Sequence, residues 1–191
     1  MEPACRPGID ASVAHSARVH SSRRAVAGRR GRDNPVVLQH ARALLTSGPR
    51  GTVDYIDLRD TEKIVREAAR TLDFSQPVAI MLIAVMHLVV DADDPCGVVG
   101  QLTDATPPGS YLALSQVASD IEPERMAEAA RQYNQRARET QRHRTHAEVA
   151  RFFDGLELLE PGVVVVPQWR PRSRAAAEAH SGMWGGVGRR A

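Results

Sequence analysis

The sequence predicts an α/β fold, with a largely parallel sheet, helices on both faces and an antiparallel pair of strands at one edge. Helix and strand signals alternate from residue 35 to about residue 153, as they do in a parallel sheet with crossover helices. Short apolar segments then follow one another near the C-terminal end, which favours an antiparallel edge. The strongest single signal is the run Pro77–Pro95, which is apolar from Val78 to Val90 apart from His87.

The run Pro77–Pro95 predicts a strand that is buried on both faces. It is too short for a membrane span, which needs about 20 apolar residues, and its β-branched residues and flanking turn signals fit a strand. Strands of this kind belong to parallel sheets covered by helices. Such sheets bind ligands just beyond the carboxyl ends of their strands. We therefore expect a site near His87 and the acidic turn Asp91–Asp94.

Before this run, the predicted elements are a helix, a strand and a second helix. Apolar residues recur at helical spacing over Pro35–Ser47, a proline suits its first turn and a glycine follows it, so we expect a helix there. Thr52–Leu58 predicts a short strand. Asp60 is a good N-cap for a helix that ends at Leu72.

After the run, the alternation continues. Asp94 and Pro95 predict the start of a short helix that ends at about Thr103, and a Pro-Pro-Gly turn introduces a strand over Ser110–Ser115. The remaining predicted elements are helices over Glu122–Arg138 and Thr145–Phe153, a hairpin of Leu156–Leu159 with Val163–Pro167, and a last strand at Met183–Val187.

Composition limits the classes of function. A chain of 191 residues that is 42% hydrophobic suits one domain, and a net charge of +2 gives little attraction to nucleic acid or a membrane. Residues 1–32 are rich in arginine and poor in apolar surface, so we expect them to be poorly ordered. Cys5 and Cys96 have no metal or disulfide spacing. We see neither a signal peptide nor an anchor, and expect a cytoplasmic protein.

Several segments together carry a resemblance to a known family. Their order is similar to the second half of a class I S-adenosylmethionine-dependent methyltransferase, and in particular resembles an actinobacterial branch, the S-adenosyl methyltransferase family. The similar segments are IDASVAHSARV (9–19), DNPVVLQHARALLTS (33–47), YIDLRD (55–60), LIAVMHLVVDADDP (82–95), GSYLALSQ (109–116), AEVARFFDGLELLEPGVV (147–164) and WGGVGR (184–189). The resemblance implies a Rossmann-like sheet, S-adenosyl-L-methionine as cofactor, and methyl transfer to a small-molecule acceptor.

The sequence departs from the family between residues 19 and 33. The family places a first strand, a glycine-rich loop, a helix and a second strand there, whereas this chain has HSSRRAVAGRRGR (20–32). A βαβ unit needs about 30 residues or more. We therefore expect 33–191 to form a partial methyltransferase domain that lacks the first βαβ unit and the methionine side of the cofactor pocket. Cofactor binding should be weak or absent.

The resemblance also implies roles for particular residues. Asp33 lies where an acidic residue would hold the ribose hydroxyls, or it caps a helix before Pro35. Asp57, with the Leu58 backbone, lies where the adenine amino group would donate a hydrogen bond, or it forms a turn. The wall of the site after the long run would be Ala84, Val85 and His87, with His87 either accepting a proton or packing in the core. Asp91, Asp93 and Asp94 are more typical of a solvated turn than of a metal site.

Two other classes of function stay open. A central strand contributes on the order of 10 kcal/mol, as much as the whole stability of a domain, so its loss would leave sheet edges that favour pairing with another chain. The protein would then be an oligomerising or binding remnant of a methyltransferase. Alternatively, the arginine-rich head and Arg131, Arg138 and Arg142 could contact phosphates, although a solvated helix face is the simpler interpretation of these arginines.

Overall fold

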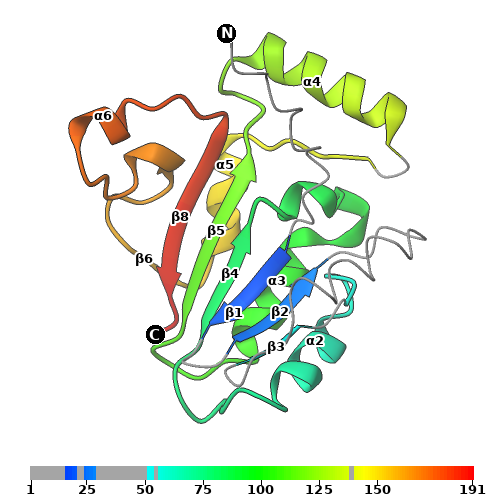
Figure 1. Cartoon of the computed structure of the whole chain (residues 1–191), viewed down its shortest axis with the longest axis vertical. Helices are drawn as coiled ribbons and strands as arrows, with labels where there is room; N and C mark the ends of the chain where they lie inside the picture. Colours follow the sequence, from blue (N-terminus) through cyan, green and yellow to red (C-terminus); the bar gives the residue numbers. More distant parts are fainter. Residues whose placement is uncertain (1–15, 21–23, 29–50, 54–55, 138–139) are drawn as a thin grey trace, which may run out of the picture.

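A mixed eight-stranded sheet forms the centre of the molecule (Figure 1). The structure, a computed structural model, describes residues 16–20, 24–28, 51–53, 56–137 and 140–191. Within them the strand order is β3-β2-β1-β4-β5-β8-β6, and β7 also pairs with β8. The strands are β1 (Ser16–His20), β2 (Arg24–Gly28), β3 (Gly51–Val53), β4 (Ala79–Ile83), β5 (Tyr111–Val117), β6 (Glu157–Leu158), β7 (Val164–Val165) and β8 (Met183–Arg189).

The strand directions confirm the predicted α/β class and the antiparallel edge. β4 and β5 are parallel, with Ile80 opposite Leu112, and β2 and β3 are parallel as well. β8 is antiparallel to β5 along its whole length. The sequence predicts parallel strands with an antiparallel partner at one edge. The structure has this arrangement at its C-terminal side, where β8 lies beside the parallel strands β4 and β5.

The hairpin β1–β2 lies within residues 1–32, the segment that the sequence predicts to be poorly ordered. β1 is antiparallel to both β2 and β4, with Val19 opposite Ile80. A hairpin at this place gives the second edge of β4 backbone partners, which buried peptide groups require. The rest of the segment 1–32 and the helix predicted over Pro35–Ser47 lie outside the described residues.

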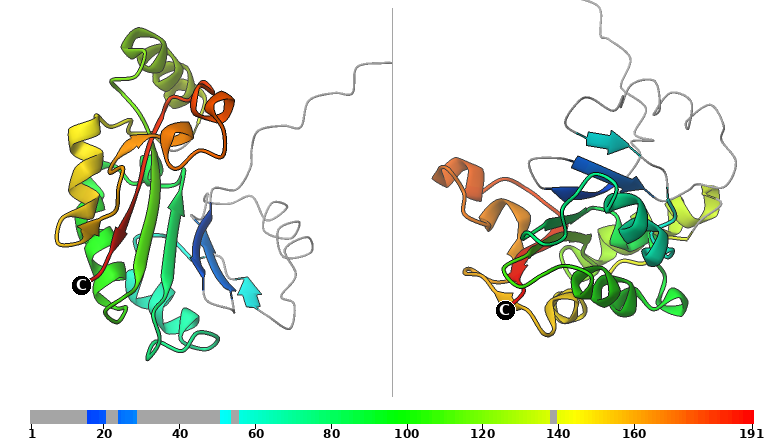
Figure 2. Two further views of the ribbon diagram at one scale, coloured as in Figure 1. Left: turned by 90° about the vertical axis from the view of Figure 1, so that its left-hand side faces the viewer. Right: turned by 90° about the horizontal axis from the view of Figure 1, so that it is seen from below.

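Three helices cover one face of the sheet (Figure 2). They are α2 (Thr61–Ala68), α3 (Pro95–Asp104) and α5 (His146–Ala150), which continues into the turn η3 (Arg151–Phe153). Alternate residues of the central strands point at this layer, because side chains alternate across a strand. The buried members of the strands are Ile80 and Leu82 of β4 and Leu112 and Leu114 of β5; those of the helical layer include Ile64, Val98, Val99, Leu102, Val149, Phe152 and Phe153.

The other face carries shorter elements at the β8 side. Gly185 and Gly186 are neighbours in β8 and therefore face opposite sides of the sheet. A Cβ on Gly186 would meet Phe153 of the helical layer, whereas one on Gly185 would meet Val166 of the turn η4 (Val166–Gln168). The four-residue helix α6 (Arg174–Ala177) follows η4. Farther along this face, Ile83 and Tyr111 are exposed.

The predicted helix starts are confirmed. Asp60 accepts a hydrogen bond from the Lys63 amide, and Asp94 accepts one from the Gly97 amide. Thr145 and Glu148 form a reciprocal capping box at the start of α5. α4 (Pro123–Arg136) also matches its predicted position, but none of its residues is buried. Each cap satisfies amides that the first turn leaves without a partner in the helix.

The long apolar run is not one strand. β4 ends at Ile83, Ala84 turns into positive φ (50°), and two short helical turns follow, η1 (Met86–Leu88) and η2 (Asp91–Asp93). β4 is also buried on one face only. The apolar composition of the run correctly predicts burial, but residues 85–89 are buried in a helical turn and not in a strand. The predicted strand Thr52–Leu58 is shorter too, because β3 ends at Val53 and Ile56–Leu58 is irregular.

The predicted hairpin of residues 156–159 with 163–167 is wrong in its pairing. β6 and β7 each pair with β8 and not with each other. They act as one interrupted strand along the edge of β8: the Leu159 amide still donates to Val187, and residues 160–163 loop out. Gly162 supplies a φ of 89° in this loop, which glycine adopts without steric cost.

Candidate functional site at the carboxyl edge of the sheet

The carboxyl ends of β4 and β5 meet at one edge of the sheet, where the predicted site residues were expected. Ala84 and Val85 directly follow β4, and the Ala84 amide donates to both the carbonyl (3.1 Å) and the hydroxyl (3.0 Å) of Ser115 near the end of β5. Asp57 and Leu58 follow β3 at the start of α2. The structure therefore brings four of the predicted residues to this edge, whereas Asp33 lies outside the described residues.

Asp57 is a half-buried carboxylate that Arg59 holds in place. The Arg59 backbone and Nε donate to Asp57 Oδ1 (3.1 and 2.9 Å), and Nη2 donates to Oδ2 (2.6 Å). Nη1 donates to Oδ2 of Asp93 in η2 (3.2 Å). The side-chain hydrogen bonds that Arg59 donates to Asp57 are the main reason that the pKa of Arg59 is raised above its ordinary value. An ionised carboxylate only accepts hydrogen bonds, so the chemistry of Asp57 suits ligand groups that donate them.

Ala84 and Val85 form a strained turn directly after β4. Ala84 is one of few non-glycine residues described with a positive φ, at 50°, a conformation that costs roughly 1–2 kcal/mol in an L-residue. Val85 and Leu58 are both buried. Residues held in such conformations cluster at ligand sites, so the turn is a candidate wall for a bound molecule.

His87 lies deeper than a reactive group at a ligand site would. Its side chain is 2% exposed within the turn η1. Its backbone carbonyl accepts a hydrogen bond from the Arg142 amide (2.7 Å). The structure thus brings His87 to the predicted edge but beneath the surface, packed on the segment that contains Arg142.

We call that segment, Gln141–Thr145, the strap, because its hydrogen bonds join β5, α4 and the turn that contains His87. Gln116 of β5 donates to the Arg142 carbonyl (2.9 Å). The Arg144 amide donates to Val117 and the Arg144 carbonyl accepts from Ser119. The strap also joins α4, since the Gln141 amide donates to Asn134 Oδ1 (2.7 Å).

A network of charges links the strap to the turns after β4. Asp91 accepts from Arg142 Nε (2.8 Å) through one oxygen and from Arg144 Nη2 (3.0 Å) through the other. Arg142 also donates to Glu148 (2.7 Å). The Arg142 hydrogen bond is the largest influence on Asp91 and lowers the pKa of that carboxyl; burial opposes it and Arg144 adds to it.

A second polar cluster lies where β5 ends and β8 begins. Asp120 accepts hydrogen bonds from the His146 amide (2.8 Å) and from the indole Nε1 of Trp184 (2.6 Å). The His146 and Trp184 rings meet edge to face, 4.8 Å apart. Burial raises the pKa of Asp120, but these two donors outweigh it and leave the pKa below its usual value. Sequence reasoning missed this cluster, because its members are far apart in the chain.

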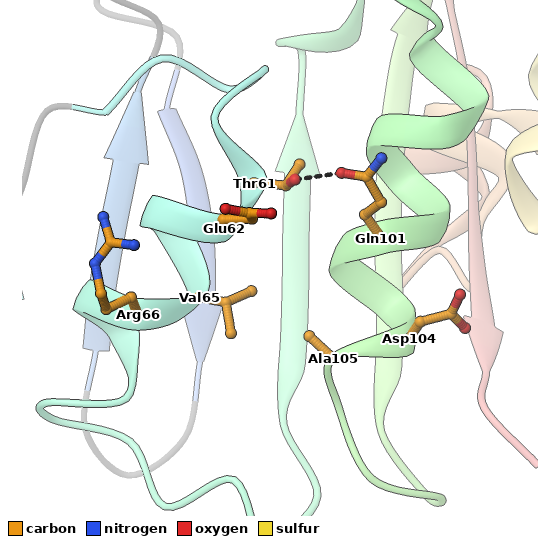
Figure 3. A pocket seen from close by; sticks show the side chains of 7 residues that line it. All are labelled: Thr61, Glu62, Val65, Arg66, Gln101, Asp104 and Ala105. Carbon is orange, nitrogen blue, oxygen red and sulfur yellow. Dashed lines mark hydrogen bonds between the residues drawn. The ribbon is translucent and has the colours of Figure 1, made fainter.

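A groove of about 670 Å³ lies between α2 and α3 (Figure 3). It contains none of the predicted site residues. Thr61 and Gln101 hydrogen-bond across it, and Val65 faces into it, whereas Arg66 and Asp104 point away from its centre (Figure 3). Its remaining lining residues are Glu62 and Ala105. The groove separates two helices on the outside of the helical layer.

The described residues contain neither a metal-binding cluster nor a helix that could span a membrane. No group of three or more His, Cys, Asp or Glu side chains there could hold a metal ion. Among the helices of the described ranges, none has the length and apolarity needed to cross a bilayer.

The comparisons with known proteins agree with the α/β class of the fold. A family described as S-adenosyl methyltransferase matches residues 31–191. The chain belongs to this family. A crystal structure of a DUF574 family protein from Streptomyces avermitilis is 40% identical, with a TM-score of 0.72, over 82% of this chain and 62% of that protein. A putative methyltransferase from Thermobifida fusca is 36% identical, with a TM-score of 0.71, over 82% of this chain and 60% of that protein.

More distant structures share the fold alone. An O-methyltransferase family protein from Burkholderia thailandensis has a TM-score of 0.52 at 14% identity, over 82% of this chain and 41% of that one. No protein with a curated description matches the chain. The S-adenosyl methyltransferase chain described here spans about three fifths of the length of the Streptomyces and Thermobifida proteins. The family's cofactor is S-adenosyl-L-methionine.

Proposed function

We propose that the protein is an S-adenosylmethionine-dependent methyltransferase for a small-molecule acceptor, and that this chain alone holds the cofactor weakly, by its adenosine end. Family membership over residues 31–191 supports the first part. The second part rests on the carboxyl edge of the sheet. The described residues there include groups that suit the adenosine end of the cofactor, whereas at the methionine side β1 runs opposite to β4.

The adenosine side fits the groups that are present. Asp57 is half-buried and fixed by Arg59, and its carboxylate is a hydrogen-bond acceptor, which suits an exocyclic amino group. The Leu58 backbone lies beside it. The turn Ala84–Val85 follows β4, which the hairpin β1–β2 separates from β3 in the sheet, and its partly exposed residue Ala84 would supply an apolar wall. Asp33 stays a proposal from the sequence for the ribose hydroxyls.

The methionine side lacks a strand–loop–helix arrangement in the described residues. β1 runs opposite to β4 and pairs His20 with Ala79, so the carboxyl end of β1 lies at the other edge of the sheet. Only residues 21–23 connect β1 to β2. Three residues are too few for a glycine-rich loop and a helix, which place helix amides against a charged group at anion sites.

Methyl transfer would depend mainly on positioning. When bound, the cofactor supplies a sulfonium methyl group that an acceptor displaces in line, and holding two reactants in line is the largest contribution that such a site makes. The proposal that His87 accepts the acceptor's proton needs the side chain to reach the surface from its buried place. Unchanged turnover in a His87→Asn variant would exclude that role.

A comparison of two ligands tests the proposal. Calorimetric titration of the chain with S-adenosylhomocysteine and with adenosine should give dissociation constants within about threefold of each other, since only the shared adenosine end is held. If S-adenosylhomocysteine binds tenfold or more tightly than adenosine, on the order of 1.4 kcal/mol, the methionine end is held too and the weak-binding part is wrong. If neither binds, this chain holds no cofactor.

A matched pair of variants locates the site. Asp57→Asn should weaken both ligands by about tenfold, because a buried hydrogen bond to a charged group is lost. Asp73→Asn is the control, since the Asp73 carboxylate lies in an exposed turn where it bonds to Ser75. Equal effects of the two variants would place the ligand elsewhere.

A further inference from the structure

A buried guanidinium lies behind the turns that follow β4. Arg144 is 3% exposed. Its Nη1 donates to the Met86 carbonyl (2.9 Å), and its Nη2 donates to the Val89 carbonyl (2.7 Å) and to Asp91 Oδ1 (3.0 Å). The face of the guanidinium lies over the Phe152 ring, with Cζ 5.4 Å from its centroid. All three acceptors thus belong to one segment of six residues.

Burial of the charged Arg144 guanidinium costs free energy that a residue serving only to fill space would not require. Removing a charge from water costs several kcal/mol, and an apolar side chain of similar volume often serves stability as well or better. Asp91, the carboxylate that Arg144 contacts, has a side chain that is 60% exposed, which weakens the compensation. A planar fork, however, fixes two carbonyls and a carboxylate at set angles, as an ammonium group cannot.

The backbone of Arg144 is itself fixed. Its amide and carbonyl pair with Val117 and Ser119 at the end of β5, so the guanidinium is anchored to the sheet. Two residues earlier, the Arg142 amide bonds to the His87 carbonyl (2.7 Å). The segment 86–91 is therefore held from the strap at three backbone carbonyls, those of Met86, His87 and Val89.

We propose that Arg144 is a positioning residue for the cofactor site: by holding segment 86–91 against β5, it sets the strained Ala84–Val85 turn, whose partly exposed residue Ala84 faces the bound adenosine. This rests on the proposed function in naming the ligand. Arg144 touches neither the proposed ligand nor the reacting atoms, and acts through the turn. The strap residue is 60 positions away in the chain from the turn that it controls.

Hydrogen exchange and ligand binding, measured together, test this. In Arg144→Lys the charge stays but the fork is lost, so amides of residues 85–90 should exchange about tenfold faster in the ligand-free chain, while those of β5 keep their rates. The dissociation constant for adenosine should rise about tenfold. Arg189→Lys is the control, since Arg189 lies at the opposite end of the sheet and contacts Glu157 on the surface; neither quantity should change.

The outcomes separate this inference from the proposed function. Should the unaltered chain bind no adenosine, the proposed function fails, and the exchange rates alone decide whether Arg144 holds the turn. Unchanged exchange at 85–90, or an equal increase throughout β5 and α3, overturns the positioning role. If Arg144→Lys does not fold, Asp91→Ala decides: local acceleration at 85–90 supports the inference, and wild-type rates refute it.

Discussion

His143 is a histidine whose surroundings oppose its protonation. It lies in the strap and is 8% exposed. Burial lowers its pKa below the ordinary value of 6.5, the charge of Arg142 lowers it further, and a hydrogen bond to the Met126 backbone acts in the opposite direction. Because the unfolded chain binds this proton more readily, the contribution of His143 to stability is complete above about pH 6.5 and is lost as the pH falls through the lower pKa of the folded state.

Replacing His143 should therefore flatten the pH profile of stability. Between about pH 7.5 and about pH 5.5, the free energy of unfolding should fall less in His143→Gln than in the unaltered protein. Urea unfolding at several pH values measures this. His180→Gln is the control, since the His180 side chain is 61% exposed. Parallel profiles for His143→Gln and the unaltered protein would show that folding does not lower the pKa of the His143 imidazole.

At the scale of residues, the sequence predicts which residues follow a strand better than it predicts their hydrogen-bond partners. Asp57, Ala84 and His87 could be placed at the carboxyl edge because each follows a segment with a clear strand signal. Arg144 could not, since its acceptors are more than 50 positions away and its own neighbourhood is full of arginines that look solvated. Burial of a charge is set by packing, which no local pattern in this sequence encodes.

Among the elements, β8 illustrates how closely a strand can approach the helical layer. Gly188 faces the ring of Phe153, and a Cβ there would lie 3.0 Å from Phe153 Cδ1 and 3.1 Å from Leu156 Cβ. Contacts that close force neighbouring groups to shift. The glycines near the C-terminal end, which lack the context of a nucleotide-binding loop, serve this close packing.

A pair of alanine substitutions tests the packing. Gly188→Ala should lower the free energy of unfolding by about 1–3 kcal/mol, the usual cost of overpacking. Gly100→Ala, in the middle of α3, meets no atom within 4 Å and should raise it by about 0.5–1 kcal/mol through helix propensity. Chemical denaturation of both variants measures the difference. A neutral Gly188→Ala would mean that β8 can move away from Phe153.

The element predictions succeeded where local chemistry determines the outcome. Asp60, Asp94 and Thr145 mark helix starts because each offers an oxygen to free amides of the first turn. The apolar run failed as a strand because burial alone does not fix backbone conformation. Its second half takes its hydrogen bonds from the strap, which the sequence gives no reason to place there.

For the whole molecule, the described outer strands are short. β3 has three residues at one side of the sheet, and β6 has two at the other. The sequence predicted open edges that would pair with a second chain, and the hairpin β1–β2 now lies beside β4 where such an edge was expected. Short edge strands are one of the ways in which proteins avoid edge-to-edge pairing.

We therefore expect the protein to be a monomer. Light scattering coupled to size exclusion should give a mass of about 20.9 kDa that does not change on dilution. A mass of twice that value, falling on dilution, would instead support the oligomerising remnant that the sequence left open. The same measurement at high salt would show whether exposed arginines contribute to any association, because salt screens their charges.

The position of β8 has a consequence for synthesis of the protein on the ribosome. This strand pairs with β5, β6 and β7, yet its residues 183–189 are translated after all three of its partners. At about 5–20 residues per second, the roughly 65 residues between the end of β5 and the start of β8 take several seconds to appear. During that time β8 cannot yet cover the edge of β5 with which it pairs, and an uncovered strand edge can pair with another chain.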